Sequence, residues 1–151
     1  AANGNSGVGL VEIYDLSSTN SSKLANISTR GSVQTAENVM IGGFILGGTS
    51  INPAKVVIRG IGPSLAQAGI SNPLSNPSLS LFDSNGQLVG SNNNWQDNPN
   101  QAAQLQALGL APGNPAESAL VAILPPGQYT AVVGGQNGGT GIGLIEVYSI
   151  Q

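Results

Sequence analysis

Charged and chemically reactive side chains are scarce in this chain of 151 residues. It has no histidine and no cysteine, which removes the commonest general base, the thiol nucleophile and any disulfide. Only 7% of its residues are charged, with four Lys and Arg against seven Asp and Glu, so no basic patch exists for nucleic acid. The sequence predicts no catalytic residue, no metal site, no cofactor and no nucleic-acid partner.

Aromatic residues are also few, at 4%, and long helical periodicity is absent. No apolar run is long enough to span a bilayer, so we expect no membrane insertion. A low charge together with abundant Ser, Thr, Asn and Gly is typical of a bacterial extracellular or cell-surface protein. We therefore expect a secreted chain whose signal peptide has already been removed.

What the chain does contain is a repeat. Residues 7–16 (GVGLVEIYDL) return as residues 141–150 (GIGLIEVYSI), at an offset of 141 − 7 = 134. Counted from Asn3 and Asn137, seven of the fourteen aligned positions are identical. Both faces of the repeated strand are mostly apolar, which is typical of a strand covered on both sides. One structural position thus has two candidate occupants in one molecule.

Two interpretations of the repeat follow. Either both copies are ordinary strands of one monomer, or the N-terminal copy leaves its own domain and completes the sheet of a neighbour. Repeated head to tail, this second contact does not close, and it builds a filament of identical subunits. Residues 17–22 (SSTNSS) have no apolar anchor and span roughly 20 Å when extended, which is enough to hand the strand to another chain.

We favour strand donation, with a donor strand and linker over residues 1–22 and a sandwich domain over 23–151. The partner is then other copies of the same chain. The predicted interface consists of Val8, Leu10, Val11, Glu12, Ile13, Tyr14 and Leu16. The equivalent C-terminal positions are Ile142, Leu144, Ile145, Glu146, Val147, Tyr148 and Ile150.

The rest of the sequence is typical of short strands separated by turns. Apolar runs predict strands at 24–30, 39–46 and 55–61, the last two pairing across the turn at 47–53. Residues 62–69 and 100–108 predict short helices, and none longer than about three turns is expected.

Two hairpins are predicted from turn residues. Asn85-Gly86 favours a hairpin between 78–82 and 87–89, and the prolines and glycine at 125–127 favour another between 119–124 and 128–133. With little helix and many short strands, the expected fold is all-β. It is a single β-sandwich of jelly-roll or Greek-key type with an N-terminal strand extension.

The segments 79–95 and 117–133 resemble those of pre-peptidase C-terminal domains, which are extracellular bacterial β-sandwich modules. The resemblance covers roughly residues 78 to 148 and implies an accessory module rather than a catalytic domain. It also implies a calcium-binding turn, at which this chain has Asn92, Asn93 and Asn94 with Asp97 as the nearby carboxylate. A site with one carboxylate binds calcium weakly, so we expect a structural polar loop there.

Two further roles concern single side chains. Glu12 and Glu146 occupy equivalent positions on an apolar strand and need a partner, for which Arg59 is the favoured cation. The rival function is a monomeric module that contacts a glycan or a cell surface. Its candidate ligand loop is built from Asn93, Asn94, Trp95 and Asp97, with Trp95 as the aromatic platform.

Overall fold

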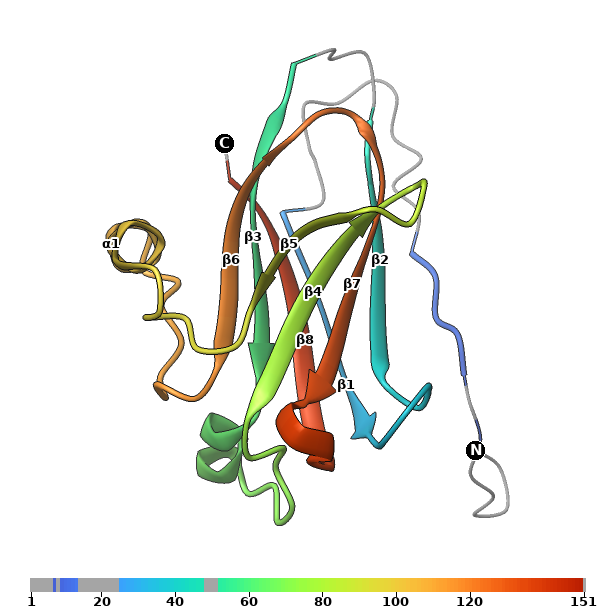
Figure 1. The fold of residues 1–151 in the computed structure, drawn as a ribbon, viewed down its shortest axis with the longest axis vertical. Helices are drawn as coiled ribbons and strands as arrows, with labels where there is room; N and C mark the ends of the chain where they lie inside the picture. The colour runs from blue at the N-terminus through green and yellow to red at the C-terminus, as the bar shows by residue number, and fades with distance from the viewer. Residues whose placement is uncertain (1–6, 8, 14–24, 48–51, 151) are drawn as a thin grey trace.

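Two four-stranded antiparallel sheets face each other in the computed structural model of the chain, which describes residues 7, 9–13, 25–47 and 52–150 (Figure 1). The first sheet has the order β1-β8-β3-β6, with β1 at Asn26–Val33, β8 at Gly141–Ile150, β3 at Ala54–Ile61 and β6 at Ser118–Leu124. The second has the order β2-β7-β4-β5, with β2 at Met40–Leu46, β7 at Gly127–Gly135, β4 at Pro77–Asp83 and β5 at Leu88–Asn92. The expected all-β sandwich is confirmed.

The chain alternates between the sheets at every step except one. Only β4 and β5 follow each other within one sheet, and this order is that of an eight-stranded jelly roll. Their connection is the hairpin expected from Asn85-Gly86. The Asp83 carboxylate closes it by accepting hydrogen bonds from the backbone N–H groups of Asn85 (2.8 Å) and Gln87 (2.9 Å).

Two predicted pairings are wrong. Residues 39–46 do not pair with 55–61, because β2 pairs with β7 whereas β3 lies in the other sheet between β8 and β6. Residues 119–124 do not form a hairpin with 128–133 either, since β6 pairs with β3 and β7 pairs with β2 and β4. In both places the two successive strands lie in opposite sheets instead of pairing within one.

The main core fills the space between the two sheets. Its centre is fully buried and includes Val33, Ile58, Leu79, Leu81 and Val133. Four partly buried residues form its margin: Ile27, Phe44, Leu46 and Ala122. Three of these four lie on β1 and β2, the adjoining edge strands on one side of the sandwich. That side of the core is therefore the less completely covered one.

A second core lies on the outer face of the β1-β8-β3-β6 sheet. There α1 (Pro99–Ala107) stands beside β6 (Figure 1), and Leu105, Trp95, Val57 and Ala119 are buried together. The Asn98 side chain caps the start of α1, and Gly109, just after its end, has a φ of 67°.

Two 3₁₀ segments complete the described structure, η2 at Pro63–Ala68 and η3 at Gln136–Gly138. Among the described residues no helix exceeds the nine residues of α1, and none is long and apolar enough to cross a membrane. The expectation of short helices only is confirmed.

Candidate subunit interface

The C-terminal copy of the repeat is β8, and it is covered on both faces as its sequence predicts. Ile145 and Val147 point into the main core, where they are 2% and 9% exposed. Tyr148 and Ile150, on the other face, pack against the second core. Strands β1 and β3 flank β8 on either side, so its backbone is paired along both edges.

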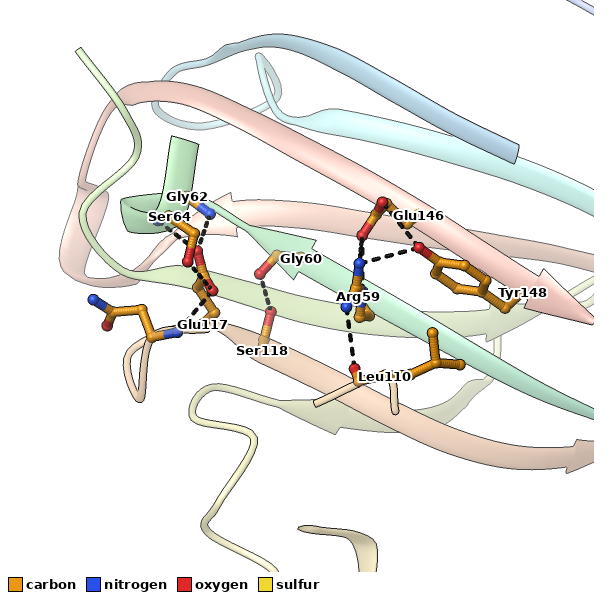
Figure 2. Close-up of polar contacts among 10 residues, drawn as sticks. Arg59, Gly60, Gly62, Ser64, Leu110, Glu117, Ser118, Glu146 and Tyr148 are labelled. Carbon is orange, nitrogen blue, oxygen red and sulfur yellow. Dashed lines mark hydrogen bonds and ion pairs between the residues drawn. The ribbon is translucent and has the colours of Figure 1, made fainter. Parts of the chain in front are cut away.

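Glu146 of β8 lies directly opposite Arg59 of β3 and forms an ion pair with it, as predicted (Figure 2). The Arg59 Nε donates to Glu146 Oε2 at 2.8 Å, and a terminal guanidinium nitrogen contacts the same oxygen. Arg59 also donates to the Tyr148 hydroxyl (3.0 Å) and to the Leu110 carbonyl (3.2 Å), and it lies over the Tyr148 ring. The pair fixes the register of β8 against β3.

The Tyr148 hydroxyl in turn donates to Glu146 Oε1 at 3.1 Å. Burial raises the pKa of the Tyr148 phenol above its ordinary value of 10.0, and the neighbouring Glu146 carboxylate raises it further while Arg59 opposes the shift. The three side chains form a closed polar cluster on an otherwise apolar face. Its hydrogen bonds join side chains of β3 and β8, so the cluster holds the two strands together.

The N-terminal copy has the opposite environment. Residues 9–13 belong to neither sheet, and the structure assigns them no strand. Val11, equivalent to Ile145, is 86% exposed, and Ile13, equivalent to Val147, is 60% exposed. Leu10 is 82% exposed, and Glu12 is exposed as well. Nearly the same sequence is therefore buried in one place and open to solvent in the other.

The predicted interface residues are only partly visible. Val8, Tyr14 and Leu16 lie outside the described residues, as does the linker over 17–22. Figure 1 shows the segment 9–13 outside the sandwich, on the side where β1 and β2 are the edge strands. The strand predicted over 8–16 is absent from residues 9–13 of the single chain. Its formation against a second chain stays a prediction.

In the alternative ligand loop, Trp95 is buried and cannot serve as an aromatic platform. Trp95 is 6% exposed and packs in the second core, where its indole N–H donates to the Asn114 carbonyl at 3.2 Å. Asn93 and Asp97 line a shallow polar hollow beside β4 and β5, and Asn94 donates to the Asp97 carboxylate at 3.3 Å. Without the Trp95 ring the hollow has no stacking surface for a sugar.

A buried carboxylate that the sequence analysis did not single out organises one end of the sandwich. Glu117 is fully buried. Its carboxylate accepts hydrogen bonds from the backbone N–H groups of Gly62 (3.1 Å), Ser64 (2.8 Å) and Asn114 (3.1 Å), and from the Ser64 hydroxyl (2.8 Å) (Figure 2). Four donors compensate for the burial of the charge and join the start of η2 to the loop before β6.

Glycine is required beside this carboxylate. A side chain at Gly62 would place its Cβ 2.0 Å from the Leu74 carbonyl oxygen. The Gly62-Pro63-Ser64 sequence thus presents two N–H groups to Glu117 where a larger residue does not fit. Only the sequence Gly-Pro-Ser at the start of a helix hinted at this contact, since Glu117 lies more than 50 residues away.

Metal-binding side chains do not gather in the part of the chain that the structure describes. No group of three Asp, Glu, His or Cys residues lies close enough there to hold an ion. In the loop at 92–97, the Asn94 side chain donates to the Asp97 carboxylate, and the structural role expected for this loop stays a prediction.

No protein-family model and no curated protein matches the chain. Among solved structures it is similar to the pre-peptidase C-terminal domain of collagenase from Bacillus anthracis, with 17% identity over 82% of this chain and 89% of that one, at a TM-score of 0.46. It is also similar to dimeric latent PorU from Porphyromonas gingivalis, with 13% identity and a TM-score of 0.36 over 88% of this chain. The chain spans only 13% of PorU. A pre-peptidase C-terminal domain, the kind of module that the sequence resembles, is thus among the solved structures found to be similar.

Proposed function

We propose that this protein is a non-enzymatic structural subunit of an extracellular filament, assembled head to tail by donation of the N-terminal strand between subunits. One observation carries the proposal. A segment that nearly duplicates the buried strand β8 lies outside both sheets, with Leu10, Val11 and Ile13 between 60% and 86% exposed. A sequence suited to a strand covered on both faces gains a matching environment when a second chain supplies it.

Docking of the donor strand is favourable only if it also stabilises the acceptor chain. Burying Val11 and Ile13 contributes roughly 3–6 kcal/mol, at about 1.5–3 kcal/mol per side chain. Ordering the backbone of residues 9–13 costs about 5–10 kcal/mol. The cost is the larger of the two terms, so the unpaired edge of the acceptor sheet and the uncovered margin of its core supply the difference.

The test is a negative-stain image of the purified full chain, together with sedimentation over a range of concentrations. We expect filaments for the unaltered protein. Val11→Asp should raise the critical concentration about a hundredfold or abolish assembly, because it buries an unpaired charge in the donated strand. Ile123→Asp is the matched control: Ile123 is 71% exposed on β6, and the same substitution there should leave assembly unchanged.

Two other results would contradict the filament proposal or the role of the N-terminal strand in it. Monodisperse particles of the unaltered protein at every concentration would contradict the filament proposal and favour the monomeric module. Equal effects of the two Asp substitutions would show that general surface apolarity, rather than the N-terminal strand, drives association.

A further inference from the structure

We propose that the acceptor is the free edge of β1, and that the donated segment pairs with it in one register in which Glu12 of one copy faces Arg30 of the next. This inference rests on strand donation as the function and adds the place, the direction and the contact that select the register. Three independent features of the described residues point to β1.

The first feature is a backbone edge with unpaired groups. Strand β1 pairs with β8 on one side, and no described residue pairs with its other side. The Ser149 N–H donates to the Ala25 carbonyl at 2.9 Å, so the odd-numbered residues of this strand exchange hydrogen bonds with β8. By alternation, the backbone groups of Ser28, Arg30 and Ser32 point to the open edge and are available to a new strand.

The second feature is the incomplete cover of the core beside this edge. Ile27, on the inner face of β1, is only half-buried, and Thr29 on the same face is exposed. Phe44 and Leu46 of β2 form the facing part of the same margin. A strand added beside β1 would lay two apolar side chains over this margin and close the side of the sandwich.

The third feature is a duplication of the acceptor sequence that matches the duplication of the donor. The chain has two arginines, Arg30 and Arg59, and each is followed by glycine. Arg59-Gly60 lies on β3, where Arg59 faces Glu146 and Gly60 faces Ile145 of β8. Arg30-Gly31 lies on β1, where Arg30 is exposed and makes no ion pair with any described residue.

Placing the donor beside β1 as β8 lies beside β3 gives one register. An antiparallel donor with Glu12 opposite Arg30 has Val11 opposite Gly31, as Ile145 is opposite Gly60. Arg30 is one of the residues whose backbone groups face the open edge, so Glu12 and Arg30 form a hydrogen-bonded pair. The inner face then receives Val11 and Ile13, which meet the uncovered margin of the core.

The ion pair is what selects this register. A slip of two residues keeps every side chain on its face and every backbone hydrogen bond in place, so apolar burial alone distinguishes the alternatives poorly. Only one of these registers sets a carboxylate opposite the guanidinium. The other described edge strands, β2, β5 and β6, carry no Arg or Lys at all, so the charge complementarity favours β1.

Disulfide trapping tests the placement, because the natural chain has no cysteine. Leu10→Cys and Ser32→Cys are made on separate full-length chains, mixed under assembly conditions and oxidised. The proposed register sets residues 10 and 32 opposite each other as a hydrogen-bonded pair, at about 5.5 Å between Cα atoms, which a disulfide spans. Ser28→Cys is the matched control: Ser28 is an exposed serine on the same face of β1 but about 13 Å further along the strand.

We expect disulfide-linked pairs between the 10 and 32 variants, identified by mass, and at least tenfold fewer between the 10 and 28 variants. A reversed preference overturns the register. If filaments form but neither mixture cross-links, the donor docks elsewhere, which overturns this inference and leaves strand donation standing. If the unaltered chain forms no filaments and nothing cross-links, both proposals fail.

A fold-back hairpin within one chain is a separate outcome. It is detected when a single chain carrying both Leu10→Cys and Ser32→Cys closes as a monomer while the mixed single variants do not link. That result would place the segment on its own β1 and would overturn the choice of a second copy as the occupant.

Charge reversal provides the second measurement. Arg30→Glu should raise the critical concentration for assembly about tenfold, and Glu12→Arg should do the same. Combining both substitutions should restore assembly, since the pair is rebuilt with opposite signs. Glu37→Arg is the control, because Glu37 is an exposed acid in the loop after β1 and lies outside the proposed contact. Failure of the double variant to recover overturns the pairing.

Discussion

At the scale of single residues, three of the charged side chains hold elements of the fold together. Arg59, Glu146 and Tyr148 hold β8 to β3, and Glu117 holds the start of η2 to the loop before β6. The first pair followed from the sequence, because a carboxylate on an apolar strand needs a cation and few cations exist. The Glu117 contact did not, because its four donors include three backbone N–H groups, which every residue type except proline carries.

Replacing Glu117 tests whether its hydrogen bonds stabilise the folded chain. Glu117→Ala leaves three backbone N–H groups and one hydroxyl without an acceptor, and we expect it to lower the free energy of unfolding by about 3 kcal/mol or more. Glu117→Gln keeps the shape but turns donors toward donors, so a smaller loss is expected. Urea denaturation measures both. Glu37→Ala, at an exposed carboxylate, should change stability by less than about 0.5 kcal/mol.

We expect the stability of the protein to depend on alkaline pH through Tyr148. Its pKa is raised in the folded chain, so its contribution to stability is complete below pH 10 and is lost as the pH rises through the folded value. Tyr148→Phe removes this contribution along with the hydroxyl. The urea midpoints of the unaltered and variant proteins should therefore converge above about pH 10.

The interval between pH 6 and 8 is the internal control for that experiment, because the difference between the two midpoints should be constant there. A difference that stays constant up to pH 11 would show that the pKa of Tyr148 is the same in the folded and the unfolded chain, which would contradict the prediction.

At the scale of elements, strand positions were predictable and strand partners were not. Apolar runs and the turn residues that flank them place β2, β3, β6 and β7 within a few residues of their observed bounds. However, a turn of prolines and glycines has the same composition whether it returns the chain to the same sheet or carries it to the opposite one. The Asn-Gly turn between β4 and β5 was the exception, because that dipeptide favours the tight twist of a two-strand hairpin.

The repeat also shows that local sequence does not determine which strands pair. Residues 9–13 and 143–147 share three identical side chains, yet one segment is a buried strand and the other lies outside both sheets. Local sequence therefore defines what kind of strand each copy is suited to be. The neighbours decide whether it becomes one. Both flanking strands of β8 come from its own chain, and this arrangement could not be read from the sequence.

At the scale of the whole molecule, the sandwich has all eight strands of a jelly roll without the N-terminal segment. We expect deletion of residues 1–16 to leave a folded, monomeric domain with nearly unchanged urea stability, since no described residue before Asn26 belongs to a sheet. Sedimentation and circular dichroism measure the two properties. An unfolded product would mean that the segment is part of its own sandwich, and persistent filaments would mean that it is not the assembling element.

The position of the donated segment just before its proposed acceptor strand has a consequence for how growth is controlled. Twelve residues (14–25) separate Ile13 from the start of β1, so every chain carries a competitor for its own acceptor edge. In the language of polymer chemistry, a subunit whose segment paired with its own β1 would be a chain terminator, because it could no longer accept another subunit. The short connection between the two sets an effective concentration of about millimolar for this pairing within one chain. Under the proposed assembly, growth would therefore require a high local concentration of subunits, and dilute chains would stay monomeric.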